Sequence, residues 1–409
     1  MPKSSCTIGG FEKVVRTGGA IVIAIALVRG AAFAARPTSQ VLIAGGESLD
    51  SNGFSTVTNT SEIYDSASGT FTSSGNMTAA RQFHTATLVN VPNNTGSTTA
   101  EVLITGGADA TNTPLSSAEL YDPTAGSFSA TGSMNYAREY QTASPLPNGD
   151  VLIAGGQLYD SATSNFVVLD SAEIYDPTTG QFSMVTCTVG GVSSVDCMSS
   201  PRYGATATVL SNGEVLIAGG YSGGSTNSGV SDTADLFDPT TNSFVSVSNL
   251  MLDYREFASA ALLNDGTVLI AGGIDNLGTV ASAEIYDPTS DSFSPAFSSM
   301  IVPREQGTAT VLGDGNVLEA GGSYSSTGTN TDLYQQRTGT FTSGGTLSVD
   351  RYAQTATLLS NGSVLIAGGF GSGGKPQNTA DLANSRGTRI SATGTMNASR
   401  AGQTATLLP

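Results

Sequence analysis

Residues 364–369 read VLIAGG, four apolar residues closed by a pair of glycines, and this stretch recurs along the chain. Identical copies lie at 41–46, 151–156, 215–220 and 268–273. Two variants, VLITGG at 102–107 and VLEAGG at 317–322, complete a set of seven. Successive glycine pairs are 47 to 64 residues apart. A period near fifty, made of short apolar runs, indicates a repeat architecture.

Each repeat contains four segments with strand chemistry. One run, such as 206–210, precedes the glycine-paired stretch, and another, such as 283–287, follows it after a variable loop. A Pro-Thr turn then leads to a short run that carries Phe. In five copies Asn-Gly or Asp-Gly separates the first two runs, which predicts a tight hairpin because these dipeptides accept positive φ angles. Four short strands in about fifty residues predict one blade of a β-propeller.

The repeats are incomplete at the two ends in complementary ways. Residues 41–46 are a second strand without a first strand before it, and 403–408 match a first strand without a second strand after it. We therefore predict an all-β fold, a seven-bladed propeller with four antiparallel strands per blade, in which the C-terminal strand completes the N-terminal blade. That closure leaves no unpaired sheet edge at the junction.

The first 34 residues do not fit the repeat. Basic residues precede an apolar run over 20–28, and 32–34 offer small residues for cleavage, which is the pattern of a secretory signal peptide. As a membrane anchor the run is too short, since a span needs about 20 apolar residues, and Arg29 interrupts it. We expect 1–34 to be removed and 35–409 to form the propeller, secreted, periplasmic or at the cell surface, with no stable membrane span.

The charge balance restricts the partners. The whole chain carries a formal charge of −17, and without 1–34 it keeps 12 basic and 32 acidic residues. A net charge near −20 argues against nucleic acids and anionic membranes as partners. We expect a monomer that binds a protein or a glycan.

Two cysteines lie in an insertion over 185–200. Cys187 and Cys197 are the only cysteines outside the N-terminal segment, and export would place them where a disulfide forms by default. The alternative is a pair of free thiols. A zinc site is not expected, because no histidine lies nearby and two further ligands would be needed.

The repeat resembles a known family. Residues 134–182 contain MNYAREYQTA, NGDVLIAGG and SAEIYDPTTGQF, and these motifs are similar to the kelch repeat of galactose oxidase-like β-propellers of the secreted bacterial type. The resemblance covers 35–409 and implies a kelch propeller without implying one activity, because such propellers serve as protein-binding modules, copper radical oxidase scaffolds and sugar-modifying enzymes. One departure is that the usual Trp of strand four is replaced by Phe71, Phe128, Phe182, Phe244, Phe293 and Phe341, in a chain without Trp.

Two sets of charged residues recur in register. Arginines precede the first strand of each repeat: Arg81, Arg138, Arg202, Arg255, Arg304, Arg351 and Arg400. Acids recur on the third strand: Glu62, Glu119, Glu173, Asp235, Glu284, Asp332 and Asp381. Because a feature repeated in every blade normally serves structure, we predict that these sets form ion pairs and backbone contacts within or between blades. An arginine-lined funnel for anions is the alternative.

Metal and nucleophile motifs are absent from the sequence. His84 is the only histidine, so it cannot supply a His-rich copper site, and no GxSxG, HExxH or phosphate-loop motif occurs. We expect no metal and no cofactor, and we treat His84 as a repeat variation, with a role as general base as the alternative. Whether the acidic loops hold calcium stays open.

The strand order predicts where a ligand binds. The loops after strands two and four share one face, and they vary in length and sequence, as binding loops on a rigid scaffold do. Candidates near the repeated arginines are Gln82, His84, Glu139, Tyr140, Tyr203, Glu256, Phe257, Glu305, Gln306 and Tyr352. Candidates after the glycine pairs are Glu47, Asp109, Tyr159, Asp160, Tyr221, Asp275, Asn276, Tyr324 and Phe370.

Three functions are compatible with these residues. The leading hypothesis is a secreted module that binds a protein or a glycan through the face of variable loops. The second is a carbohydrate-active enzyme without copper, in which Glu139, Glu256 and Glu305 supply an acid and a base. The third is a structural surface protein without a small ligand.

Overall fold

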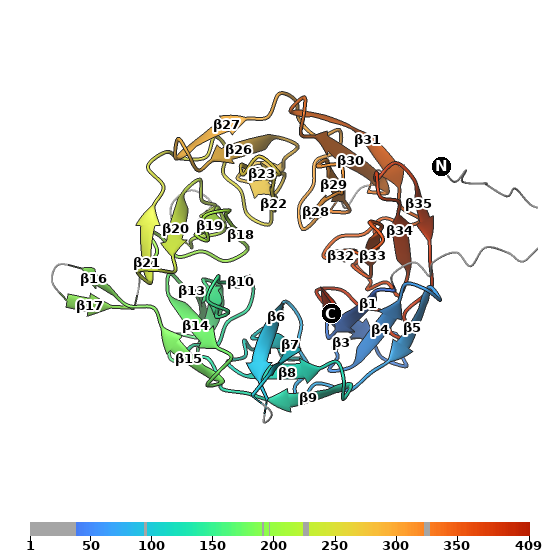
Figure 1. Ribbon diagram of the computed structural model, residues 1–409, viewed down its shortest axis with the longest axis horizontal. Helices are drawn as coiled ribbons and strands as arrows, with labels where there is room; N and C mark the ends of the chain where they lie inside the picture. Colours follow the sequence, from blue (N-terminus) through green and yellow to red (C-terminus); the bar gives the residue numbers. More distant parts are fainter. Residues whose placement is uncertain (1–37, 94–95, 190–191, 196, 224–228, 323–327) are drawn as a thin grey trace, which may run out of the picture. The chain divides into compact units, whose positions relative to one another are not determined.

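The computed structural model describes residues 38–409 except 94–95, 190–191, 196, 224–228 and 323–327, so the expected signal segment and Tyr324 lie outside the described residues. Residues Arg36–Pro409 form one compact unit. Seven four-stranded antiparallel sheets follow one another around a ring, as Figure 1 shows. The prediction of a seven-bladed all-β propeller is therefore confirmed. In the described ranges, no helix is long and apolar enough to cross a membrane.

The blades are numbered here by their second strand, and each is given from the axis outward. Blade 1 contains β36 (Thr404–Leu407), β1 (Gln40–Ala44), β4 (Ser61–Asp65) and β5 (Thr70–Ser73), and blade 2 contains β6 (Thr85–Pro92), β7 (Thr98–Thr105), β8 (Ala118–Asp122) and β9 (Ser127–Ala130). Blade 3 contains β10 (Thr142–Pro145), β11 (Val151–Ala154), β14 (Ala172–Asp176) and β15 (Gln181–Met184), and blade 4 contains β18 (Thr206–Val209), β19 (Val215–Ala218), β20 (Ala234–Asp238) and β21 (Ser243–Ser246).

The remaining blades keep the same order. Blade 5 contains β22 (Ser259–Leu262), β23 (Val268–Ala271), β26 (Ala283–Asp287) and β27 (Ser292–Pro295), and blade 6 contains β28 (Thr308–Val311), β29 (Val317–Ala320), β30 (Asn330–Gln335) and β31 (Thr340–Thr346). Blade 7 contains β32 (Thr355–Leu358), β33 (Val364–Ala367), β34 (Ala380–Ala383) and β35 (Ile390–Ala392). Four additional hairpins are β2 (Glu47–Leu49) with β3 (Ser55–Val57), β12 (Gln157–Asp160) with β13 (Asn165–Val168), β16 (Cys187–Val189) with β17 (Val192–Ser194), and β24 (Ile274–Asp275) with β25 (Gly278–Thr279).

The core lies between the blades, and the second strand of a blade contributes side chains to it on both faces. In blade 1, Val41 and Ile43 pack against blade 7, whereas Leu42 and Ala44 pack against blade 2. Alternate residues of a strand point to opposite faces, so a strand buried between two neighbours must be apolar at every position. This is why five of the seven second strands read as unbroken apolar runs.

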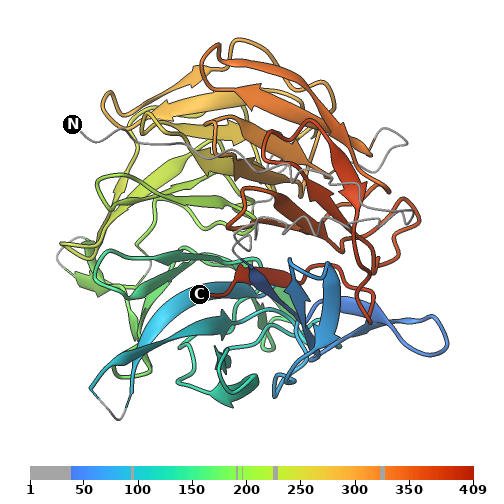
Figure 2. The same cartoon turned by 45° about the vertical axis from the view of Figure 1, so that its right-hand side comes forward.

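The ring closes through the chain ends. Strand β36 pairs antiparallel with β1, with Val41 opposite Leu407 and Ala44 opposite Thr404. Figure 2 shows the red C-terminal strand beside the dark blue first strand. The C-terminal strand therefore completes the N-terminal blade, as predicted.

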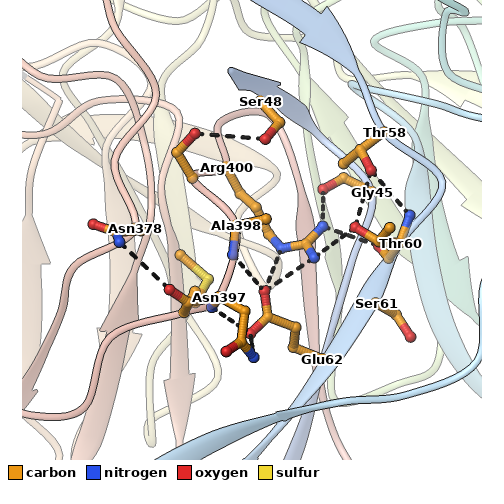
Figure 3. Close-up of polar contacts among 12 residues, drawn as sticks. Gly45, Ser48, Thr58, Thr60, Ser61, Glu62, Asn378, Asn397, Ala398 and Arg400 are labelled. Carbon is orange, nitrogen blue, oxygen red and sulfur yellow. Dashed lines mark hydrogen bonds and ion pairs between the residues drawn. The ribbon is translucent and has the colours of Figure 1, made fainter. Parts of the chain in front are cut away.

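Each repeated arginine holds its own blade together. In blade 1, Arg400 donates from Nη1 to the carbonyl oxygens of Gly45 and Thr60, both at 2.9 Å, and from Nη2 to Glu62 Oε1 at 3.1 Å (Figure 3). The other Glu62 contacts include the backbone N–H of Ala398. The same arrangement recurs, at 2.7–3.1 Å, in the pairs Arg81–Glu119, Arg138–Glu173, Arg202–Asp235, Arg255–Glu284, Arg304–Asp332, Arg351–Asp381 and Arg400–Glu62.

The same arginines join neighbouring blades through their backbone. The N–H of Gly46 in blade 1 donates to the carbonyl oxygen of Arg81 in blade 2 at 2.8 Å. Gly45 packs so closely that a Cβ there would lie 2.5 Å from the same oxygen, and both glycines have positive φ. Because a side chain fits neither the space nor the left-handed backbone, the glycine pair is required at each joint.

The insertion after blade 3 carries the predicted disulfide. Cys187 and Cys197 are bonded, with their Cα atoms 5.7 Å apart. This confirms the pairing expected from the sequence.

Blade 6 breaks the pattern of its neighbours inside the core. Glu319 stands where the other six second strands have Ile, and its side chain is fully buried. Ser259 of blade 5 donates a hydrogen bond to Glu319 Oε2 at 2.8 Å, but Oε1 has no partner. Burial raises the pKa of the Glu319 carboxyl to about 7, against the opposing effects of the Ser259 hydrogen bond and the nearby Arg304 charge.

The first prediction concerns the arginine pairs. Replacing Arg138 by Met should lower the free energy of unfolding by about 3–5 kcal/mol, because the buried Glu173 carboxylate loses its counter-charge. Urea denaturation followed by circular dichroism measures the change. The exposed Arg386 provides the matched Arg386→Met control, which should unfold like the unmodified protein. Equal unfolding midpoints for the two variants would show that the pairs do not stabilise the ring.

The second prediction concerns closure. Deleting 404–409 should lower the melting temperature sharply and promote self-association, because β1 becomes an unpaired edge strand. Thermal melting and light scattering test this, with deletion of the exposed Pro409 alone as control. A truncated protein that stays monomeric and melts like the control would contradict the closure.

The third prediction concerns Glu319. Its carboxyl titrates near 4.5 when unfolded and near 7 when folded, so the folded state retains the proton longer and the free energy of unfolding falls as the pH rises through that window. Glu319→Ile should remove the part of this dependence that comes from Glu319 and stabilise the protein by about 1–3 kcal/mol at pH 8. Urea denaturation at pH 5 and pH 8 measures the change in the free energy of unfolding, with Ile366→Val as the control for a substitution in the core. If the free energy of unfolding of the unmodified protein does not fall between these pH values, the raised pKa of Glu319 is wrong.

Candidate functional site

The segment after each repeated arginine brings three residues to the axis at the start of the innermost strand. The loops after strands two and four meet there, because the innermost strand begins on the face that those loops form. The residue just after the arginine pairs with a residue beyond the glycine pair, as in the bridges Glu139–Gln157 and Tyr203–Tyr221. We call this side of the ring the loop face.

The second residue after each arginine has a left-handed backbone. These seven residues all have φ between +50° and +61°, and their backbones form a closed ring in which each N–H donates to the carbonyl oxygen of the preceding member at 2.8–3.3 Å. The members are Phe83, Tyr140, Gly204, Phe257, Gln306, Ala353 and Gly402. Five of the seven are not glycine, so side chains are kept at a position that would suit glycine better.

The aromatic members of this ring lie against one another and against its glycines. Phe83 stacks on Tyr140, with ring centroids 4.4 Å apart, and Tyr140 meets Phe257 edge-on at 5.5 Å. A Cβ on Gly204 would lie 2.8 Å from the Phe257 ring. Glycine at 204 therefore makes room for an aromatic cluster that occupies one side of the axis.

A cavity of about 280 Å³ lies at this end of the axis. It is lined by the second and third residues after each arginine, so all seven blades contribute two residues each. The lining residues are Phe83, His84, Tyr140, Gln141, Gly204, Ala205, Phe257, Ala258, Gln306, Gly307, Ala353, Gln354, Gly402 and Gln403. We call this space the axial cavity.

The polar groups of the axial cavity share one arrangement. Gln141, Gln354 and Gln403 are buried, and each donates from Nε2 to a backbone carbonyl of the preceding blade at 2.8–2.9 Å. Their Oε1 atoms have no partner. His84 is equally buried, lies 3.0 Å from Thr404 Oγ1 through Nε2, and leaves Nδ1 without a partner. Burial lowers the pKa of His84 to about 3, so the ring is neutral at pH 7.

Three carboxylates precede the lining residues. Burial raises the pKa of Glu139 and of Glu256, and burial with the Glu256 charge raises the pKa of Glu305 to about 7. Gln157 donates a hydrogen bond to Glu139 at 2.9 Å. Burial, followed by the Glu256 charge, raises the pKa of Tyr203 to about 12. Its ring lies about 6 Å from those of Tyr140 and Phe257, which connects the acidic residues to the cavity.

The structure thus distributes the sequence-predicted residues over two levels. His84, Tyr140, Phe257 and Gln306 line the axial cavity. The other candidates lie one residue earlier: Gln82, Glu139, Tyr203, Glu256, Glu305 and Tyr352. A binding role for either group stays a prediction.

Sequence reasoning missed four cavity residues, one at the second position after a repeated arginine and three at the third position. These residues are Phe83, Gln141, Gln354 and Gln403. The available signal was that a glutamine recurs in three repeats directly before an innermost strand. In the part of the chain that the structure describes, no three His, Cys, Asp or Glu side chains form a group that could hold a metal ion.

Hairpins on the loop face expose apolar side chains. Three of them directly follow a glycine pair: β2–β3, β12–β13 and β24–β25. Their exposed side chains include Phe54 at 71%, Phe166 at 47% and Leu277 at 95%. These side chains lie outside the axial cavity and form a separate feature of the same face.

Comparison with known proteins agrees with this architecture. A family model described as the kelch motif matches residues 201–251, which span the first strand of blade 4 to the approach to blade 5. A solved structure titled "Structure of YjhT" matches with a TM-score of 0.55 and 17% identity, over 77% of this chain and 98% of that chain, which shows a shared fold. No curated protein matches. The chain is thus a seven-bladed β-propeller of which one repeat matches the kelch motif.

Proposed function

We propose that this propeller is an exported module that binds a protein partner through its loop face. The observation that carries the proposal is the set of three hairpins, each anchored by a glycine pair and each exposing apolar side chains. Exposed apolar groups that gather on one face of a soluble protein mark interaction sites. The rigid ring fixes the hairpin bases, which limits the ordering cost of binding.

Charge and compartment support the choice of partner. The negative chain disfavours nucleic acid and anionic membranes, whereas apolar hairpin tips suit a protein surface. The disulfide between Cys187 and Cys197 is consistent with an oxidising compartment, and residues 1–34 have the pattern of a signal peptide. A monomer presents one such face per molecule.

A carbohydrate-active enzyme is the second candidate, because one observation favours it. Glu305 has a pKa near 7 in part because Glu256 lies close, and carboxyls with unequal pKa values can serve as acid and base on a glycan. The loop face would then bind the sugar at the axis and not at the hairpins.

The fourth prediction separates these functions. A combined variant with Phe54→Ser, Phe166→Ser and Leu277→Ser should lose the partner captured from the native extracellular fraction, because the apolar contacts are removed. Val245, 62% exposed on the outer strand β21, provides the matched Val245→Ser control, which should retain it. Affinity capture with protein expressed from the full sequence measures both.

Two outcomes would overturn the proposal. One is a partner that the combined variant and the control retain equally. The other is turnover of an oligosaccharide that Glu305→Gln abolishes while the hairpin variant remains fully active, which would favour the enzyme.

A further inference from the structure

We propose that blade 7 binds a small organic anion, a carboxylate or phosphate group on a short apolar body, at the end of its sheet opposite the loop face. The turns after the first and third strands form that opposite side of the ring, and we call it the turn face. A cavity of about 320 Å³ lies there, lined by residues at the ends of β33, β34 and β35. We call this space the blade 7 cavity.

Blade 7 is the blade in which the aromatic pattern of the repeat is lost. In the other six blades, an aromatic residue of strand three packs against the Phe of strand four, with ring centroids 4.8–5.1 Å apart. In blade 7, Ala383 and Ile390 take these positions and lie opposite each other in the register of β34 and β35. Both line the cavity, so the missing rings coincide with a space at the same place in the sheet.

The accessible lining combines apolar surface with hydrogen-bond donors. Ala383 is fully buried, so a ligand would meet the other lining residues. Leu382 and Ile390 are half-buried and offer apolar surface. The hydroxyls of Ser363 and Ser391 have no hydrogen-bond partner within the part of the chain that the structure describes. A ligand that matches this lining has an apolar body and carries acceptor oxygens.

The turn beside the cavity keeps its fold but loses its negative charge. In five blades an aspartate ends strand three and accepts a backbone N–H of the turn, as Asp122 Oδ1 does from Thr124 at 2.7 Å. The other four are Asp65, Asp176, Asp238 and Asp287. In blade 7, Asn384 Oδ1 accepts the N–H groups of Thr388 at 3.0 Å and Arg389 at 3.2 Å. An amide therefore caps this turn without the charge of a carboxylate.

The same turn carries positive charge that no acid neutralises. Among the Lys and Arg side chains that the structure describes, only Arg337, Lys375, Arg386 and Arg389 lie outside the buried ion pairs. Arg386 and Arg389 both belong to the turn over 384–389 and are exposed. Neither this turn nor the hairpin turn over 359–363 contains an acid. In a chain with a formal charge of −17, this end of blade 7 is locally positive and attracts an anion.

Arg389 determines which anions suit the cavity, because it is the lining residue that carries a charge. A guanidinium group presents its N–H donors in a planar fork that fits the oxygens of a carboxylate or a phosphate. The hydroxyls of Ser363 and Ser391 can donate to the same oxygens. Leu382 and Ile390 would then contact the apolar body, whereas a cation would be repelled by the two arginines of the turn.

The fifth prediction uses benzoate, phenyl phosphate, benzyl alcohol and acetate as probes in isothermal titration calorimetry. Benzoate or phenyl phosphate should bind at least about tenfold more tightly than benzyl alcohol, which lacks the anionic group, and than acetate, which lacks the apolar body. The tighter of the two aromatic anions identifies the acid group that the site prefers. If benzyl alcohol or acetate binds as tightly as both aromatic anions, or if none of the four binds, the proposal is wrong.

Two arginine variants provide a matched comparison, because each removes one exposed positive charge from a turn after strand three. Arg389→Gln should weaken the bound anion by about tenfold, since the fork of donors at the cavity is lost. Arg337 lies in the equivalent turn of blade 6 and does not line the cavity, so Arg337→Gln should bind within about twofold of the unmodified protein. Equal affinities for the two variants would exclude Arg389 from the site.

Two serine variants test the position of the site by adding a negative charge. Ser391 lies opposite Leu382 in blade 7, and Ser129 lies opposite Leu120 at the equivalent position of blade 2; both serines are exposed. Ser391→Asp should abolish binding of the anion, whereas Ser129→Asp should leave it unchanged. If both variants are folded by circular dichroism and bind equally well, the anion does not occupy the blade 7 cavity.

The site is independent of the proposed protein-binding surface because it lies on the opposite face of the ring. The combined variant of Phe54, Phe166 and Leu277 should therefore bind the anion like the unmodified protein. Loss of the anion in that variant would contradict a site on the turn face. Failure to capture a protein partner would overturn the proposed function and leave the anion measurements unaffected.

Discussion

The contact on which the ring depends is the joint between a glycine pair and the arginine of the next blade. The arginine carbonyl accepts the N–H of the second glycine, and the first glycine packs against the same oxygen with no room for a Cβ. The arginine side chain meanwhile holds its own blade through a carbonyl of the glycine pair and a buried acid. The arginine thus holds two blades in place. Its side chain binds its own blade, and its backbone carbonyl accepts a hydrogen bond from the preceding blade.

This joint also determines where chemistry can occur. It places the next three residues at the axis, and the second of them turns left-handed and closes a ring of hydrogen bonds through all seven blades. The left-handed backbone of this ring is the same whichever side chain is present, so the side chains there can vary. The same logic applies to the hairpins, whose bases are held by glycine pairs while their tips are free of the core. Conserved geometry within the repeat therefore supports two variable regions, one at the axis and one on the rim of the loop face.

Repetition made much of the structure predictable from the sequence. Seven copies of one pattern specify the strand order. The chain starts with a second strand and ends with a first strand, which predicts that these two strands pair. The ion pairs between arginines and acids followed from the same register. Glu319 shows the limit of the approach: the substitution was visible in the pattern, but its burial between blades 5 and 6 and its pairing with Ser259 come from packing. The cavity glutamines were also visible as a recurring residue, but only the fold showed that they line one cavity and donate to backbone carbonyls of neighbouring blades.

The amino-acid sequence by itself determined the number of blades, the strand order, the closure of the ring, the disulfide and the face on which loops vary, because each depends on local periodicity or on residue spacing. Tertiary structure alone decided which side chains meet. Residues such as Phe83 and Gln403 are 320 positions apart, and nothing local places them in one cavity. Each of the seven blades brings one segment to the common axis, which places these residues in one cavity. The orientation of each glutamine amide depends on a backbone carbonyl of the preceding blade.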